Sequence, residues 1–481
     1  MARLPYLIVL SMPGFPNLLQ TRVGRLVGFF GLYVSEGLPQ GFTGVAVALE
    51  FKRMGMTGEA IGTFLATIML PWGWKWLAGP LVDNFHLKRF GRRKQWIIVT
   101  QLGMLATLAA ALYFFPTLTG DPHRIVGLAL FSGILLAHNC FAACQDVAID
   151  ALACEALPEH ERGTVNGLMF AGAQVGAAIG GSGVLYLKGV LGFSTASLIA
   201  PLLLMGLLLM VILTIFESRV RRAMDAPVNA PSPAARGSAI AYLSTVLHVL
   251  FRTRRGFLGL VLAIIPFGGM ALSLTVSTVI TPMLGMTDNE IATLGLVSSL
   301  VFTVSCIAGG FLSDRIGRRL SLTLFSLGTL IPTIWMGWTL GDAGWTHPAP
   351  ALPDGSWPRN DGLISAWWLA SMAYSLFNGL MYGIRTAFYM DIIEPRIAAT
   401  QFTACMALMN LVTIYSYWWE GKAISSVADG GWGFTYSQIF YLDAALGAVF
   451  VVPLWLAGTK RPSTDPGETA CGEYTADSAN A

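Results

Sequence analysis

The sequence is poor in charge and poor in cysteine. Asp, Glu, Lys and Arg make up only 12% of its 481 residues, whereas they make up about 25% of a soluble domain. The six cysteines are scattered and five lie in or beside apolar segments, so a disulfide framework is not expected. The sequence offers no nucleophile–base pair, no metal-ligand set and no glycine-rich phosphate loop. These absences argue against an ordinary soluble domain and against an enzyme, and they predict no cofactor and no metal.

Long apolar runs are what the sequence contains instead. Hydrophobic residues make up 54% of the chain, and a helix needs about 20 mostly apolar residues to cross a bilayer. Twelve segments meet this requirement, which predicts an all-α membrane protein with twelve transmembrane helices in the lipid bilayer. The predicted spans are 26–49, 59–82, 95–115, 124–147, 163–187, 191–216, 257–284, 290–312, 320–341, 363–388, 398–419 and 435–458.

The distribution of basic residues predicts the orientation of these spans. Of the 30 Lys and Arg residues, 22 fall on segments that are cytoplasmic if the N-terminus is inside, and two lie within spans. Cytoplasmic loops carry an excess of Lys and Arg, so we expect both termini on the cytoplasmic side of a bacterial inner membrane. The other six are predicted to be external, and they are Lys52, Arg53, Arg124, Lys188, Arg359 and Lys422.

Two similarities at nearly one offset indicate that the two halves are related. "MGMTGEAIGTF" at 54–64 resembles "LGMTDNEIATL" at 284–294, and "GPLVD" at 79–83 resembles "GFLSD" at 310–314. Secondary transporters are commonly built from such repeats, with the substrate bound between them near the middle of the membrane. The predicted parts are an N-terminal six-helix bundle (1–216), a cytoplasmic linker with an amphipathic helix (217–256), a C-terminal six-helix bundle (257–459) and a disordered cytoplasmic tail (460–481).

Nearly the same offset pairs two stretches that contain helix-breaking residues. "SEGLPQG" at 35–41 lies in the first span and "IPFGGMA" at 265–271 lies in the seventh. Each places Pro or paired Gly inside a spanning helix, which predicts a break in the backbone hydrogen-bond ladder. The breaks are either packing kinks or parts of a gate or binding site.

Charged residues cluster in the loop between the second and third spans of each half. An Asp beside a helix N-terminus, with Arg partners in reach, makes a charge-assisted latch that one conformation holds and another breaks. "GGFLSDRIGRRL" at 309–320 closely resembles the loop signature of the major facilitator superfamily, and the first copy differs by five extra residues before Gly91. The resemblance implies two pseudo-symmetric six-helix bundles that work by alternating access. The predicted gating residues are Gly79, Asp83, Gly91, Arg92, Arg93, Gly310, Asp314, Arg315, Gly317, Arg318 and Arg319.

Ionisable residues inside the spans are the main functional candidates, because a charge within the membrane is costly. We predict proton coupling by Glu36, Asp146 and Asp150, with Glu36 as the carrier. A permanent structural pair, for example with Lys75, is the alternative for Glu36. Lys75 and Arg385 are predicted to bind substrate anions, and snorkelling to the headgroups is the alternative for Arg385. The superfamily resemblance implies that helices 1, 4, 7 and 10 line the cavity, which favours Glu36, Asp146 and Arg385.

Uncharged polar residues also gather on the helices that the resemblance places around the cavity. Each one alone is more often an interhelical hydrogen bond than a ligand contact, but together they predict a polar, hydrogen-bonding cavity. The predicted substrate-binding residues of this kind are Gln40, His138, Asn139, Asn166, Gln174, Asn378, Tyr382, Asn410 and Tyr415.

Several stretches resemble one branch of this superfamily. "SEGLPQGFTG", "WKWLAGPLVDNF" and "CQDVAIDALACEALPEHERGTVNG" resemble muropeptide permeases of the AmpG type. The branch also contains acetyl-CoA transporters and siderophore permeases of the RhtX/FptX type, whose eleventh-helix region is similar to "ATQFT" here. The resemblance implies a proton-coupled importer of an anionic solute such as an anhydromuropeptide, with a ferric siderophore, acetyl-CoA or a drug as alternatives.

The expected partners follow from this interpretation. They are a small anionic substrate and protons, with no nucleic acid, and the protein is expected to be a monomer. Two other classes stay open as alternatives, a membrane-bound enzyme and a transport-dead sensor.

Overall fold

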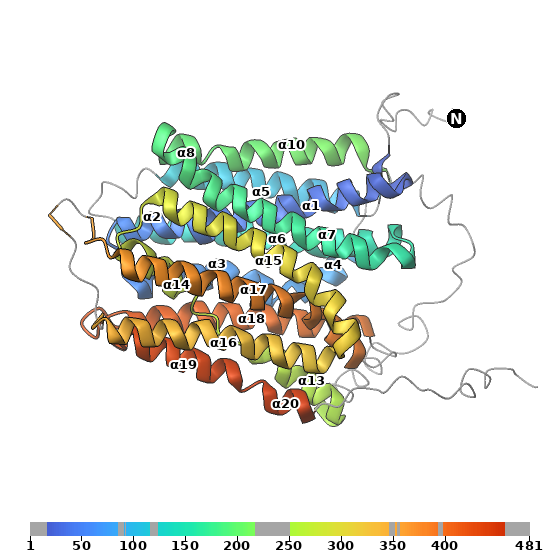
Figure 1. Cartoon of the computed structure of the whole chain (residues 1–481). Helices are drawn as coiled ribbons and strands as arrows, with labels where there is room; N and C mark the ends of the chain where they lie inside the picture. The colour runs from blue at the N-terminus through green and yellow to red at the C-terminus, as the bar shows by residue number, and fades with distance from the viewer. Residues whose placement is uncertain are drawn as a thin grey trace, which may run out of the picture.

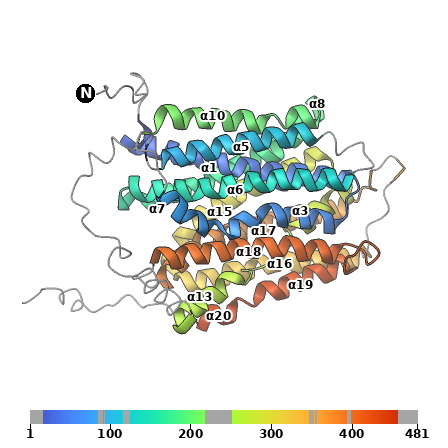
Figure 2. The same ribbon diagram turned by 180° about the vertical axis from the view of Figure 1, so that it is seen from behind.

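A computed structural model of the protein describes residues 17–84, 91, 93–115, 124–216, 251–345, 352–353, 356–392 and 398–456. Within these ranges the regular structure is helical, without β-strands. The helices lie side by side in one bundle, with the blue-to-green first half along one side and the yellow-to-red second half along the other (Figures 1 and 2). The long linker, apart from its last few residues, and the C-terminal tail predicted from the sequence lie outside the described residues.

The first half forms the six predicted spans from helices that are partly interrupted. Two of its spans contain π-helical segments and one contains a 3₁₀ turn, so a span often consists of two labelled helices. In chain order the elements are α1 (Arg22–Gly41), a π-helical segment (Phe42–Val47), α2 (Ala48–Arg53), α3 (Gly58–Gly73), a 3₁₀ turn (Lys75–Leu77), α4 (Ala78–Asn84), α5 (Lys94–Phe114), α6 (Arg124–Ala156), α7 (Glu159–Ala178), a second π-helical segment (Ile179–Gly183), α8 (Val184–Leu191), α9 (Phe193–Ala196) and α10 (Ile199–Thr214).

The second half repeats this plan with longer, less interrupted helices, apart from its first span. That span consists of two helices separated by ten residues. The elements are α13 (Arg254–Ile264), α14 (Thr275–Met283), α15 (Asp288–Ile316), α16 (Arg318–Asp342), α17 (Asp361–Ile392), α18 (Ala398–Ile424), α19 (Tyr436–Ala448) and α20 (Val451–Leu456).

Seven of the described helical segments are long and apolar enough to cross a membrane by length and composition. They correspond to the third to sixth, eighth, ninth and twelfth predicted spans. The remaining five are the first, second, seventh, tenth and eleventh. Of these, the first, second and seventh contain interruptions, and the first, second and tenth carry Glu36, Lys75 and Arg385.

The internal repeat is visible in the backbone. Gly55 and Gly285 occupy matching left-handed conformations, with φ of 79° and 77°. Two residues later, Thr57 and Thr287 cap the N-termini of α3 and α15 by accepting a backbone N–H. Left-handed glycine before a threonine cap is a local device that ends one helix and starts the next. Both copies thus build the same turn at the same place in their half.

The two predicted helix breaks behave differently. Pro39 lies inside α1, which does not end there but passes into the π-helical segment. The first span therefore continues through Pro39, but its α-helical hydrogen-bond ladder changes to π-helical bonding at Phe42. A widened π-helical segment follows the missing N–H of Pro39, and α7 packs tightly along α1. In the seventh span the chain does leave the helix, between Ile264 and Thr275, and Gly268 takes a φ of 79°.

Glycine lets α1 and α7 approach closely beside the candidate site. A Cβ added at Gly37 would lie 1.8 Å from the carbonyl oxygen of Ala173, and one added at Gly41 would lie 2.0 Å from that of Ala177. Such distances exclude any side chain, so only glycine permits this contact. The close packing fixes the position of Glu36, the residue before Gly37, within the first half.

Candidate functional site

An ion pair joins the second and fourth spans in the first half. Lys75 lies in the turn between α3 and α4, and its Nζ is 2.6 Å from Oδ2 of Asp146 on α6. The side chains are only 14% and 7% exposed. The turn exists because α3 ends at Gly73, two residues after Pro71, and this places Lys75 opposite α6. A charged pair this deeply buried is costly unless both partners are present.

The predicted proton-coupling residues lie around this pair. Glu36 on α1 is buried, and the charges of Asp146, Asp150 and Lys75 reach its carboxyl. Its Oε1 has no hydrogen-bond partner among the described residues. Asp150 accepts a hydrogen bond of 2.7 Å from the hydroxyl of Tyr33. The structure therefore brings the four predicted residues together, and Lys75 pairs with Asp146 instead of Glu36, the partner in the alternative interpretation.

A polar group that the sequence analysis did not select supports this charge cluster. Ser35 accepts hydrogen bonds from Nε2 of Gln145 at 2.7 Å and from Nε2 of Gln101 at 3.1 Å. Its own hydroxyl donates to the carbonyl of Leu32. All three polar side chains are completely buried, so they tie α1, α5 and α6 together beside Glu36. Their presence inside apolar spans was the signal that could have found them.

Trp72 links two predicted substrate-binding residues across the two halves. Its indole Nε1 donates to Oδ1 of Asn139 on α6 at 2.9 Å. Its backbone carbonyl accepts from Nδ2 of Asn410 on α18 at 3.0 Å. Asn139 and Asn410 thus both contact the same residue, Trp72, although they come from different halves. These hydrogen bonds are the interhelical contacts that compete with a ligand role.

Two other predicted residues are bonded to the backbone of neighbouring helices. His138 is buried, and its Nδ1 lies 3.1 Å from the carbonyl of Met104 on α5, while its Nε2 lacks a partner among the described residues. Tyr415 donates to the carbonyl of Ile264, the last residue of α13. The side chain of Asn166 lies outside the described part, whereas Gln40, Gln174 and Asn378 are partly buried on α1, α7 and α17.

Arg385 stacks on an aromatic group that joins the halves. Its guanidinium lies 4.7 Å from the ring centroid of Tyr382, one turn earlier on α17. The ring of Tyr382 meets Phe170 on α7 at 5.7 Å and Phe302 on α15 at 5.5 Å, edge to face. Nε of Arg385 is buried without a hydrogen-bond partner in the described part of the chain. Tyr382 therefore packs between the halves, and Arg385 keeps a donor available.

The two gating loops share one backbone feature. Gly91 and Gly317 both have a φ of 93°, so each loop turns through a left-handed glycine before the next helix. Arg93 is buried and donates to Glu155 on α6 at 2.9 Å and to the carbonyl of Val82. In the second loop the contacts are with aromatic rings. Arg315 lies over Phe311 and Arg319 lies over Trp455, whose carbonyl also accepts a hydrogen bond from Arg319.

The other predicted gating residues give less information about the latch. Gly79 and Gly310 lie in helices and have open space where a Cβ would stand. The side chains of Asp83 and Asp314, and the whole of Arg92, lie outside the described residues, so the predicted Asp–Arg latch stays a prediction. Arg318 begins α16.

Ion pairs join the halves at one end of the bundle, on the left in Figure 1, which the charge count predicts to face outward. We call it the predicted outer end. Asp288, the first residue of α15, lies 2.5 Å from Nη2 of Arg53 and 3.0 Å from Nζ of Lys188. Lys188 also contacts Glu50 at 2.6 Å. Near the ends of α3 and α18, Lys422 is paired with Glu59.

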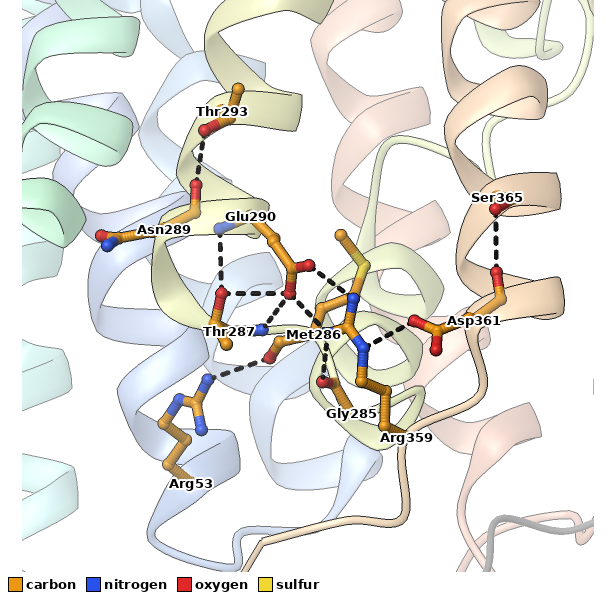
Figure 3. Close-up of polar contacts among 10 residues, drawn as sticks. All are labelled: Arg53, Gly285, Met286, Thr287, Asn289, Glu290, Thr293, Arg359, Asp361 and Ser365. Atoms are coloured by element: carbon orange, nitrogen blue, oxygen red, sulfur yellow. Dashed lines mark hydrogen bonds and ion pairs between the residues drawn. The ribbon is translucent and has the colours of Figure 1, made fainter.

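A second network at this end is centred on the second half, and Arg53 of the first half donates to the carbonyl of Met286 beside it at 3.5 Å (Figure 3). Arg359 binds Glu290 through both Nη atoms, at 2.7 and 2.9 Å, and Asp361 through Nε at 2.6 Å. The hydrogen bonds that Arg359 donates to Glu290 and Asp361 raise the pKa of its guanidinium above its usual value. Lys52 lies over the ring of Trp357. Five of the six predicted external basic residues thus have an acidic or aromatic partner at this end. Among the described residues, the ion pairs that join the halves all lie at this end.

These features define a class of protein. Two related sets of membrane-spanning helices, with ionisable residues buried inside them, are typical of a secondary transporter. The Major Facilitator Superfamily model matches residues 28–417. The chain belongs to this superfamily, and it is a multi-pass membrane transporter, not an enzyme.

Named relatives and a solved structure agree with this assignment. The chain is 30% identical over 192 residues to the putative transporter AmpG 1 of Rickettsia conorii, covering 39% of this chain and 43% of that protein. It is 24% identical over 301 residues to the anhydromuropeptide permease of Escherichia coli K12, covering 61% of this chain and 56% of that protein. The chain thus spans about half the length of these two relatives. The crystal structure of a D-xylose–proton symporter matches with a TM-score of 0.65 at 13% identity, covering 90% of this chain and 96% of that one.

Proposed function

We propose that the protein imports an anionic solute of the anhydromuropeptide type together with protons, across a bacterial inner membrane with both termini cytoplasmic. The similarity to the anhydromuropeptide permease of Escherichia coli supports the solute class. The observation that carries the proposal is the buried carboxyl of Glu36, whose Oε1 has no hydrogen-bond partner among the described residues and which stands beside the Lys75–Asp146 pair. A buried carboxyl next to an ion pair is suited to take up and release a proton.

Lys75 supplies the link between proton and solute in this proposal. The charges of Asp146, Asp150 and Glu36 all reach its ammonium group. While Glu36 carries a proton, Lys75 binds Asp146. When Glu36 loses the proton, a second carboxylate competes for the same ammonium in a medium of low dielectric constant, where such competition is strong. A carboxylate of the solute is a third competitor, so anion binding and proton release act on one residue.

The ion pairs at the predicted outer end support a state in which this end is closed. With Asp288 held by Arg53 and Lys188, and Glu59 held by Lys422, the halves are joined at that end. Transporters of this kind rock one half against the other around a central site. In this proposal the contacts must break for the outward-open state, and the described arrangement is the one with the outer end closed.

Uptake into proteoliposomes tests the proposal. The purified protein is reconstituted, and uptake of a labelled GlcNAc-anhydromuropeptide is measured with and without an inward proton gradient. We expect uptake to depend on the gradient, and Glu36→Gln to abolish gradient-driven uptake while leaving solute binding intact. Asp342→Asn, which alters an exposed carboxylate at the end of α16, is the matched control and is expected to transport normally.

The other outcomes separate the parts of the proposal. Uptake that ignores the gradient contradicts proton coupling. Gradient-driven uptake by Glu36→Gln contradicts the role of Glu36. No uptake by protein shown to be folded contradicts the solute class and makes a ferric siderophore the next solute to test.

A further inference from the structure

The break in the seventh span is held open by two carboxyl groups from other helices. Asp443 on α19 accepts backbone N–H bonds from Met270 at 2.7 Å and from Ala271 at 3.0 Å, both through Oδ2. Glu420 on α18 accepts the N–H of Val276, in the first turn of α14, at 3.2 Å. The carboxyls thus bind backbone amides on the two sides of one short non-helical stretch. Thr329 on α16 binds the N–H of Gly269 next to them, at 2.9 Å.

Both carboxyls are shielded from solvent. Glu420 is 0% exposed and Asp443 is 3% exposed. Oε1 of Glu420 is buried and has no hydrogen-bond partner among the described residues. The charge of Asp443 reaches Glu420, so the two groups belong to one electrostatic site. The helix that carries Asp443 also packs closely against the break. A Cβ added at Gly447 on α19 would lie 2.3 Å from the carbonyl oxygen of Gly268.

The other titratable groups around this site do not neutralise it. Two phenols interact electrostatically with these carboxyls: Tyr374 on α17 with both of them, and Tyr417 on α18 with Glu420. Tyr374 is also hydrogen-bonded to Ser273 within the break. Arg385 also acts on Tyr374, but it lies eleven residues further along α17, about 16 Å by helical rise. Within the described part of the chain, no ion pair joins a cation to Glu420 or Asp443.

Two neighbouring buried carboxyls without a cation cannot both be ionised at an acceptable cost, because burial and like charge both oppose it. The backbone contacts decide which one is charged. Asp443 accepts two short N–H bonds, at 2.7 and 3.0 Å, which stabilise a carboxylate. Glu420 accepts the N–H of Val276 at the longer distance of 3.2 Å, with the amide of Thr275 also acting on it, and its Oε1 has no donor among the described residues. We propose that Glu420 and Asp443 form a proton-binding site at the break of the seventh span, in which Glu420 carries the proton and Asp443 the negative charge.

This site is separate from the Glu36 cluster and lies in the other half. Its role follows from where it binds, since the amides that the two carboxyls hold belong to a span without a continuous helical ladder. Loss of the proton from Glu420 places two negative charges beside the same stretch, and the repulsion acts directly on the shape of the break. The inference does not depend on the solute or on Glu36 as a proton carrier.

Infrared spectroscopy of the full-length protein in liposomes tests this site, because a protonated carboxyl absorbs separately from a carboxylate. We expect Glu420→Gln to remove one protonated-carboxyl component at neutral pH that is retained in Glu36→Gln. Asp443→Asn removes the like charge, so we expect that component to titrate at lower pH. Ser416→Ala is the matched control, because Ser416 lies one turn before Glu420, is buried, and contacts Met270 through its sulfur. Its spectrum is expected to match the unsubstituted protein.

An unchanged spectrum in folded Glu420→Gln would overturn the proposal, because it would mean that Glu420 is ionised. If Glu420→Gln does not fold, Asp443→Asn still decides, since a component whose titration does not move contradicts the shared site. These results stand apart from the uptake experiment. A protein that fails to transport the muropeptide can still show the Glu420 component, and a protein that transports it can lack the component.

Discussion

Lys188 of the first half and Asp288 of the second half form an ion pair, with 3.0 Å between Nζ and Oδ2. Lys422 and Glu59 form the equivalent contact with the halves exchanged. In each case a lysine in the last turn of the fifth span of one half meets an acid at the start of the second span of the other. The internal repeat therefore places two related ion pairs at the predicted outer end, and opening this end requires both to break.

Removing these contacts is expected to open the predicted outer end. Asp288 and Glu59 make three partly exposed ion pairs between the halves, each worth about 0.2–1 kcal/mol. Asp288→Asn with Glu59→Gln is therefore expected to shift the closed–open equilibrium by about 3-fold to 150-fold. Spin labels at the exposed positions Val190 and Asn289 report the separation of the halves. We expect longer distances in the double variant. Arg359→Gln is the control, because its partners lie within the same half, and its distances are expected to stay unchanged. An unchanged distance in the double variant contradicts the gate.

The Lys75–Asp146 pair makes a prediction about stability. Removing one partner of a buried pair leaves an uncompensated charge and costs about 3–5 kcal/mol. Lys75→Gln is therefore expected to lower the free energy of unfolding by an amount of this order, and adding Asp146→Asn is expected to restore much of it. Neither variant is expected to transport. Denaturant unfolding in detergent and uptake measure the two effects. A double variant no more stable than the single one argues against the pair.

The second gating loop makes a prediction about glycine. Gly317 has a φ of 93°, where a side chain is strained, so Gly317→Ala is expected to destabilise the protein by about 1–2 kcal/mol. Gly310 in the same signature is helical with open space around it, so Gly310→Ala is expected to be neutral or to stabilise by up to about 1 kcal/mol. Thermal unfolding compares the two. Equal effects would show that the left-handed turn is not needed.

The Trp72 contact predicts the cost of an unsatisfied donor. Asn139→Leu leaves the buried indole N–H of Trp72 without its acceptor, 2.9 Å away in the native protein, and is expected to cost about 1–3 kcal/mol. Adding Trp72→Phe removes the stranded donor, so the hydrogen-bond part of the cost is expected to disappear. A double-variant cycle measured by thermal unfolding isolates that part. Additive effects of the two substitutions contradict the bond.

Local features of the fold follow from the sequence because they depend on neighbouring residues. Gly55 with Thr57, and Gly285 with Thr287, each end one helix and cap the next through contacts within a few residues. The same reasoning is incomplete at Pro39. The missing N–H is a local property and marks where the α-helical ladder is disturbed, but it does not tell whether the span ends or continues, as it does here, through a π-helical segment.

The candidate site shows the same division. Glu36, Lys75, Asp146 and Asp150 are recognisable because a charge inside an apolar span is costly wherever it stands. Which residues pair is a matter of position in space, and Lys75 contacts Asp146, 71 residues away, because a turn after Gly73 aims it at α6. Glu420 was missed because the predicted eleventh span ended at 419, whereas α18 continues to Ile424 and buries it.

The sequence by itself determined the number of spans, the relation between the halves and the types of residue that carry charge into the membrane. These depend on composition, spacing and local turns. Only the tertiary structure decided that Asp443 and Glu420 hold the break of the seventh span, since both come from helices more than 140 residues away. Apolar patterning determines which segments enter the membrane, but in lipid all spans are apolar alike, and their neighbours are chosen by close packing and hydrogen bonds between distant segments.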